Sequence, residues 1–442
     1  MYTDTKKTDK PISEDQMPAY TEAVKSGMYA KRSGLVGKYD NVRRYWEDEM
    51  TRHFLRGPLQ KLVKHARDEM RRIRILDLGC GSADGYELLT GIRQRDPNLH
   101  DVEVDLLTPD VLGLYKGIDF NTDLLDQACT VYEENSKMVF EQGDFTQGLP
   151  PGKNEEPYDL YFMSYGTCSH HNNDKTMIRL LADIAKHADS YCLVICDWLG
   201  RYSYEWQTLW TNDLSQNQNM DYVVSYIYNE DERETRRDEL QHLFLRLMSR
   251  DETDAIVREA AGKACVDIRT LRYFDRSVFT GRHMDTGEYN PHAQPLRLGV
   301  NSLHEANFRT DLTDLLVDYS PKERFPLLNK HFEQFQICWN ELVSYSINLL
   351  ELYSEEKQQF RADPPVPPAA SPPTLISRMK RMKRVIEGVG WLTTGLPREN
   401  IIEPQLGYSL RNMMMDLQQG MGCAHGLVGI FEIDKRSGTS VK

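Results

Sequence analysis

A short segment near residue 77 carries an acid and two glycines in an order that can hold a nucleotide. Asp77 lies near the end of an apolar run, and Gly79-Cys80-Gly81 follows it. Glycine lets the backbone turn tightly and lets a ligand approach without a Cβ in the way. The helix expected next offers free N–H groups and a partial positive charge at its N-terminus. Two glycines alone would equally fit an ordinary tight turn, so the prediction depends on later residues.

Two further acids follow two further apolar segments. Asp119 closes Gly117-Ile118-Asp119, where a carboxylate at the end of a second strand can accept from both ribose hydroxyls. Asp144, in Gln142-Gly143-Asp144-Phe145, is placed to accept from an adenine amino group. A plain helix cap or loop acid is the alternative interpretation of Asp144. In this order the acids indicate an adenosyl site.

The first turn departs from the dinucleotide-binding pattern GxGxxG. Asp84 stands where that pattern has its third glycine, and Gly85 comes one residue late. An acid at the head of a helix repels a pyrophosphate, and Asp77 beside the turn would repel it too. Both acids favour a ligand that brings a cation. The sequence therefore disfavours an NAD-type oxidoreductase.

On these residues, the segment 71–197 and the last apolar strand resemble the class I S-adenosylmethionine (SAM)-dependent methyltransferase family. The resemblance implies SAM as the cofactor. It also implies that the first-strand acid and the glycines hold the methionine part, the second acid binds ribose and the third contacts adenine. The family often has Thr-Gly or Pro-Gly where this chain has Ser82-Ala83. The implied cofactor residues are Asp77, Gly79, Cys80, Gly81, Asp119, Phe120, Asp144 and Phe145.

Methyl transfer requires the protein to align an acceptor, exclude water and, for some acceptors, remove a proton. His170 and His171 follow the fourth expected strand and are candidate general bases. The alternative is that they cap the next helix or line the cofactor pocket without proton transfer. The pair lacks a carboxylate or cysteine at ligand spacing, so no metal is expected.

Candidates for contact with the acceptor lie beyond Asp197. Tyr202 and Trp206 belong to an aromatic run that could form a pocket wall or pack in the core. The polar segment 279–310 is either a substrate site or a solvated loop, and its arginines could pair with an acidic substrate. Its candidates are Arg282, His283 and Arg309.

Short apolar strands alternate with helical segments between residues 71 and 197, which predicts βαβ units and a parallel sheet. The strands are expected at 73–78, 115–120, 137–142, 158–164 and 191–197, and a strand at 426–433 is expected to return to the sheet. The expected fold class is α/β, a Rossmann-like doubly wound, mostly parallel sheet with a large, mainly helical cap. The expected domains are an N-terminal tail and helical lid (1–70), the SAM-binding core (71–197), the cap (198–375) and a C-terminal segment (376–442).

Composition restricts the class of protein. The chain has 442 residues, 40% of them hydrophobic, and a net charge of −13, which gives no global attraction for nucleic acid. Eight cysteines without a CxxC pair indicate reduced thiols, and no apolar run is long enough to cross a membrane. We expect a soluble cytoplasmic methyltransferase acting on a small molecule. The alternatives are a protein or peptide methyltransferase and a non-catalytic SAM-binding protein, and the sequence leaves the oligomeric state open.

Overall fold

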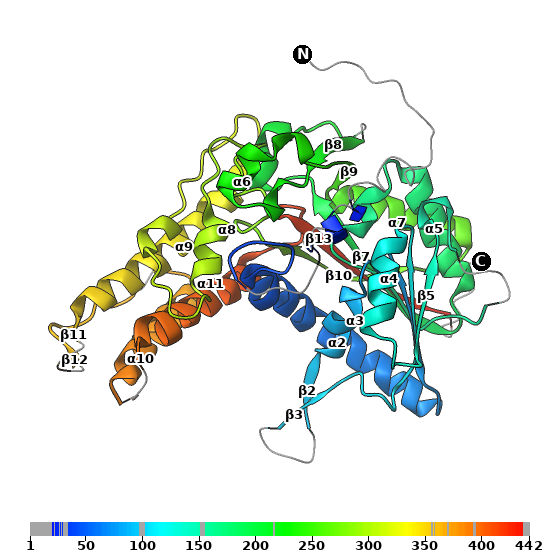
Figure 1. The fold of residues 1–442 in the computed structure, drawn as a ribbon, viewed down its shortest axis with the longest axis horizontal. Helices are drawn as coiled ribbons and strands as arrows, with labels where there is room; N and C mark the ends of the chain where they lie inside the picture. The colour runs from blue at the N-terminus through cyan, green and yellow to red at the C-terminus, as the bar shows by residue number, and fades with distance from the viewer. Residues whose placement is uncertain are drawn as a thin grey trace.

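The computed structural model describes residues 20–21, 23–25, 27, 29, 34–96, 102–150, 155–214, 217–354, 357, 359–368, 371–391 and 395–435. Within these residues a nine-stranded sheet runs through the molecule, with the strand order β10-β13-β7-β6-β1-β4-β5 and with β9 and β8 added beside β7 (Figure 1). Among the nine described strands of this sheet, β13 and β8 are antiparallel to the other seven. The expected α/β architecture with a mostly parallel sheet is confirmed.

The parallel strands of the core form from largely apolar segments, and β6 and β7 are buried along their whole length. The core strands are β1 (Ile73–Leu78), β4 (Leu112–Asp119), β5 (Met138–Gln142), β6 (Leu160–Met163) and β7 (Tyr191–Gly200), and neighbouring pairs among them are parallel. Alternate residues of a strand point to opposite faces. Ile75 accordingly packs on the side of α2 (Asp48–Asp68) and α3 (Asp84–Thr90), while Leu76 packs on the side of α5 (Asp174–His187) and α7 (Arg250–Ala264). Helices therefore cover both faces, as a doubly wound sheet requires.

The last strand returns to the sheet as expected. β13 (Gly426–Asp434) lies antiparallel between β7 and β10 (Arg269–Arg276). However, β10 falls within the range predicted to be a separate, mainly helical cap. β8 (Gln218–Val223) and β9 (His242–Met248) fall there too, and β9 pairs with β7. Residues 198–375 are therefore partly core, and the predicted domain boundary at 197 is wrong.

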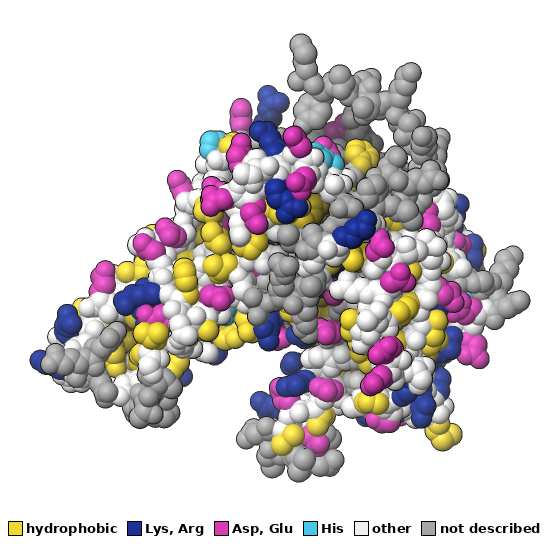
Figure 2. Space-filling view, in the orientation of Figure 1, with side chains coloured by type: hydrophobic (Ala, Val, Ile, Leu, Met, Phe, Trp, Pro, Cys, Tyr) yellow, Lys and Arg dark blue, Asp and Glu magenta, His cyan; other side chains and the backbone are white. Residues whose placement is uncertain are grey.

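A group of long helices forms an arm that projects from the sheet (Figure 1). Its long members are α9 (Pro326–Leu352), α10 (Pro373–Gly388) and α11 (Glu403–Leu417), which pack on one another. Acidic and basic side chains are interspersed over the face drawn in Figure 2. None of the described helices is both long and apolar enough to span a bilayer. The other elements are α4 (Thr122–Val131), α6 (Glu230–Thr235), α8 (Leu296–Ser302), the hairpin β2 (Arg93–Arg95) with β3 (Glu103–Asp105), and the pair β11 (Tyr353–Ser354) with β12 (Gln359–Phe360).

A buried ion network anchors the segment that precedes α2. The guanidinium of Arg297 in α8 donates to both carboxylate oxygens of Asp40 at 2.7 Å and to Glu47 at 2.7 Å. All three side chains are buried. Burial raises the pKa of Glu47, but Arg297 and the neighbouring Arg282 prevail and hold that pKa well below its ordinary value. The expected N-terminal lid is thus a buried wall of the protein between residues 40 and 47.

Replacing Arg297 with methionine should destabilise the protein by about 3 to 5 kcal/mol, because Asp40 and Glu47 would be left buried without their cation. The measurement is the free energy of unfolding in urea. Arg309→Met is the matched control, because the Arg309 side chain is 60% exposed, and it should change stability by about 0.5 kcal/mol or less. Equal effects of the two substitutions would contradict the anchoring role of the network.

Candidate functional site

A cavity lies at the carboxyl ends of β1, β4, β5, β6 and β7, where open α/β sheets bind their ligands. It encloses about 1280 Å³, its open mouth included. Residues before α2, the β8–β9 pair and the residues around the end of β10 and the start of β13 complete its walls. The cavity therefore brings together segments from the first and the last part of the chain.

The glycine turn forms one end of this cavity. Gly79 and Gly81 both have the left-handed backbone that favours glycine, with φ of 70° and 54°. A Cβ on Gly79 would lie 2.5 Å from Cγ2 of Thr167, so that position also needs glycine for space. The Asp119 carboxylate accepts the N–H of Gly81 at 2.9 Å and that of Asn121 at 2.9 Å. These bonds fix the turn against the end of β4.

The residues expected around the base line the same end. Phe120, Asp144 and Phe145 all face the cavity, as does Cys80 between the glycines. Oδ1 of Asp144 accepts the N–H of Thr146 at 2.9 Å and its hydroxyl at 2.6 Å. The alternative interpretation of Asp144 as a helix cap is therefore correct for this one oxygen, and the residue also lines the cavity.

Asp77 does not line the cavity. It is buried beneath the turn, where the Tyr115 hydroxyl donates to Oδ2 and where Oδ1 has no hydrogen-bond partner in the part of the chain described. A Cβ on Gly85 would lie 2.2 Å from Oδ2 of Asp77, so glycine at this position leaves space for the carboxylate. Burial, with the charges of Asp119 and Asp84, raises the pKa of Asp77 to about 8, although Tyr115 opposes the shift. Asp77 thus supports the turn from behind, which contradicts the direct ligand contact predicted for it.

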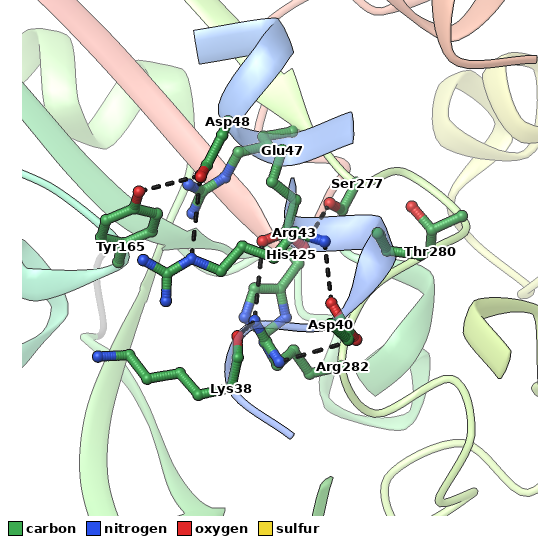
Figure 3. A network of polar contacts seen from close by, with 12 residues as sticks. Lys38, Asp40, Arg43, Glu47, Asp48, Tyr165, Ser277, Thr280, Arg282 and His425 are labelled. Atoms are coloured by element: carbon green, nitrogen blue, oxygen red, sulfur yellow. Dashed lines mark hydrogen bonds and ion pairs between the residues drawn. The ribbon is translucent and has the colours of Figure 1, made fainter. Parts of the chain in front are cut away.

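Asp84 faces the cavity together with two cations. Lys38 Nζ and Arg43 Nη2 each lie 2.9 Å from Asp84 Oδ2. Burial raises the pKa of Asp84, but Lys38 and Arg43 outweigh it and lower the pKa below its ordinary value. Arg43 also lies 3.9 Å over the ring of Tyr165, whose hydroxyl donates to Asp48 at 2.9 Å (Figure 3). Acidic and basic side chains therefore form ion pairs beside the glycine turn.

The other end of the cavity has aromatic, aliphatic and basic walls. Tyr222 of β8, Tyr226, and Leu243 and Leu245 of β9 line it, and Tyr222 and Leu243 are cross-strand neighbours in the β8–β9 pair. Arg282, one of the predicted substrate residues, lines this end as well. Its guanidinium lies 4.9 Å over the ring of Tyr226 and donates to the carbonyl oxygens of residues 37 and 38 at 3.1 and 2.7 Å.

The two candidate bases lie in different surroundings. His170 lines the cavity with Nε2 3.2 Å from the Tyr20 hydroxyl, and burial lowers its pKa to about 4. His171 is buried away from the cavity with Nδ1 3.1 Å from the Thr176 hydroxyl, and burial first, then His170, lowers its pKa to about 3. His171 therefore lies outside the cavity, and the residue that caps α5 is Asn173. His170 stays at the site, but such a low pKa makes it a weak base.

Two aromatic candidates belong to the packing of the protein. Trp206 is fully buried and its Nε1 donates to the carbonyl of Gly200 at 2.8 Å. Tyr202 is half-buried with its ring 6.3 Å from that of Trp210. Neither side chain lines the cavity, so the interpretation as a pocket wall is wrong and the alternative of core packing is right.

Two polar candidates also lie away from the cavity. His283 is completely buried behind it, with its ring 4.7 Å from that of Tyr222. Arg309 is exposed on the surface, 3.9 Å from Glu399. Many side chains of the polar segment 279–310 are buried in hydrogen bonds to distant parts of the chain, which local sequence patterns do not reveal.

His425 lines the cavity but was not among the predicted site residues. Its Nδ1 lies 3.0 and 3.1 Å from the two carboxylate oxygens of the buried Glu205. A usable signal existed, because His425 directly precedes the strand expected to return to the sheet. A returning antiparallel strand begins at the edge where the parallel strands end.

Alanine at the two glycines of the turn should have unequal effects. Gly81→Ala should cost about 1–2 kcal/mol, because of its left-handed backbone alone. A Cβ on Gly81 meets nothing within 4 Å among the described residues. Gly79→Ala should cost more, because Thr167 occupies the space of its Cβ. Urea unfolding of both variants measures the difference, and an equal loss would contradict the close packing of Gly79 against Thr167.

The raised pKa of Asp77 predicts a stability difference that depends on pH. The folded protein holds a proton on Asp77 up to about pH 8, whereas the unfolded chain releases it near the ordinary value of 3.8. Stability contributed by this group is therefore complete below about pH 4 and is lost as the pH rises through about 8. Wild type should lose stability relative to Asp77→Asn across this window, as measured by urea unfolding at each pH. A difference that does not change with pH would show that the folded carboxyl titrates normally.

No protein-family model matches this chain, and no curated protein matches it. Solved structures of SAM-dependent methyltransferases resemble it at low identity. One from Clostridium acetobutylicum is 11% identical, with 53% of this chain and 86% of that chain covered and a TM-score of 0.33. An amino pentose methyltransferase from Micromonospora echinaspora, solved with SAM bound, is 12% identical, with 58% and 90% covered and a TM-score of 0.31. Likenesses this distant do not establish what this chain binds or transforms.

Proposed function

We propose that this protein is a SAM-dependent methyltransferase that acts on a small molecule held in its cavity. The observation that carries the proposal is a single cavity with two chemically different ends. One end has the glycine turn, Asp119 and two phenylalanines, and the other has tyrosines, leucines and arginines. A group-transfer enzyme needs a donor site and an acceptor site that open into one another and exclude water.

The residues at the first end fit SAM. Asp119 is held at the end of β4 by backbone N–H groups, and its remaining lone pairs suit ribose hydroxyls. The rings of Phe120 and Phe145 are available to flank the base. Asp84 with Lys38 suits the methionine end of SAM, which carries both an ammonium and a carboxylate group. A dinucleotide, with its anionic pyrophosphate, would meet Asp84 instead. When bound, SAM supplies an electrophilic methyl group on a sulfonium.

The second end favours a small acceptor. Its walls come from the segment before α2, from β8 and β9 and from the end of β10, so they surround the space from several sides. Enclosed, largely apolar pockets with a few polar groups are typical of small-molecule sites. A protein acceptor would instead require an open groove beside the cofactor end.

Incubation with methyl-labelled SAM and cell extract tests the acceptor class. The extract is separated afterwards into small-molecule and protein fractions, and label should appear in the small-molecule fraction. Heat-denatured protein is the control for spontaneous methylation. Label found only in protein would contradict a small-molecule acceptor, and no label in either fraction would contradict catalysis.

Calorimetry tests the cofactor end. Asp119→Ala should weaken SAM binding about tenfold or more, because it removes charge-assisted hydrogen bonds to the ribose. Asp126→Ala is the matched control, since Asp126 is an exposed acid on α4 outside the cavity, and it should bind SAM like wild type. Unaltered tight binding by Asp119→Ala would mean that the ribose lies elsewhere.

A further inference from the structure

His425 is held at the cavity by the sheet itself. The next residue, Gly426, pairs with Leu199 as β13 begins beside β7. The backbone carbonyl of His425 accepts the N–H of Gly200 at 3.1 Å, and its own N–H donates to the carbonyl of Ser277 at 3.3 Å. The imidazole is thus fixed to two strands at the edge where the cavity opens. A catalytic side chain needs this kind of rigid support.

Glu205 is a buried carboxylate whose acceptor positions are filled by protein donors. It accepts the N–H of His283 at 2.7 Å, the hydroxyl of Ser203 at 3.0 Å and Nδ1 of His425 at 3.0 Å. A Cβ on Gly281 would lie 1.9 Å from Glu205 Oε1, so a glycine is required beside it. Burial raises the pKa of Glu205, but His425 and His283 outweigh burial and lower the pKa. Glu205 is therefore ionised near neutral pH and can only accept hydrogen bonds.

The ionised partner determines which nitrogen of His425 carries the proton. Because Glu205 cannot donate, Nδ1 must carry the hydrogen, and Nε2 of the neutral ring is then a free base. Among the described residues, none makes a hydrogen bond to Nε2 of His425, and this residue lines the cavity.

We propose that His425 is the general base for methyl transfer, that Glu205 is its positioning residue, and that the acceptor is a hydroxylated aromatic small molecule. The proposal rests on the methyltransferase function proposed above and names its acceptor class. The oxygen of the acceptor forms the new bond to the methyl carbon, and the pair of the broken carbon–sulfur bond stays on sulfur. The hydroxyl proton moves to Nε2, where Glu205 stabilises the imidazolium until the proton passes to solvent.

The walls near His425 agree with this acceptor class. Rings of Tyr222 and Tyr226 line the same end of the cavity, and flat aromatic rings pack well against such side chains. The ring of Tyr222 lies 6.3 Å from that of His425. The charged and titratable groups around His425 come from several elements. They are Glu47, Asp197, Glu205, Arg276, Arg282 and His283.

Nuclear magnetic resonance of the full chain with ¹⁵N-labelled histidine tests the arrangement without any substrate. The His425 signals are assigned by their loss in His425→Gln. The neutral imidazole of His425 in wild type should carry its proton on Nδ1 and leave Nε2 bare. Glu205→Gln should give a mixture of the two tautomers, because an amide can donate as well as accept. A wild-type His425 protonated on Nε2, or a tautomer unchanged by Glu205→Gln, would overturn the proposal.

The catalytic role is tested with labelled SAM and the small-molecule fraction that accepts the label. His425→Gln should lower kcat about a hundredfold or more while SAM binding by calorimetry stays as in wild type. His292→Gln, at an exposed position, is the matched control and should keep full activity. The labelled product should be a methyl ether. Full activity of His425→Gln, or a product methylated elsewhere than on oxygen, would overturn the inference, whereas a wild type that does not bind SAM would refute the proposed function itself.

Discussion

The buried contact of Arg297 with Asp40 and Glu47 is the constraint on which the site depends. Charges removed from water must be paired, and here the partners are more than 200 residues apart in sequence. The contact holds the segment before α2 across the carboxyl edge of the sheet. Lys38 and Arg43 face the glycine turn for this reason, and the same segment closes one side of the cavity. Without this segment, the carboxyl edge of the sheet would be open on that side and would not enclose a cavity.

The parts of the fold that follow from local sequence could be predicted. The strand ending at Leu78 and its glycine turn are encoded within a few residues, because burial on both faces demands an apolar run and the left-handed turn demands glycine. β10 could not be predicted, since only its second half is buried and arginines interrupt it. The ion pairs of Arg43 and Glu47, within the expected helical lid, could not be predicted because their partners lie in distant segments that local patterns do not reveal.

The chemical roles of the histidines likewise depend on contacts that the local sequence does not reveal. A pair of neighbouring histidines after a strand suggested a base, but burial lowers the pKa of both, and His171 lies outside the cavity beside the Thr176 hydroxyl. His425 stands alone in the sequence and gains its chemistry from Glu205, which reaches it only in the folded chain. Residue type and spacing therefore predicted most residues that line the glycine-turn end of the cavity and few that line its other end. The first end is local to the strand ends, whereas the second is assembled from four separate segments.

The most direct test of the account is an experimental structure of the protein with S-adenosylhomocysteine, the product that SAM leaves after methyl transfer. We expect the ribose at Asp119, the base between Phe120 and Phe145, and the sulfur directed toward the end of the cavity that holds Tyr222 and His425. A nucleoside bound elsewhere, or a sulfur directed away from that end, would contradict the division of the cavity into donor and acceptor sites.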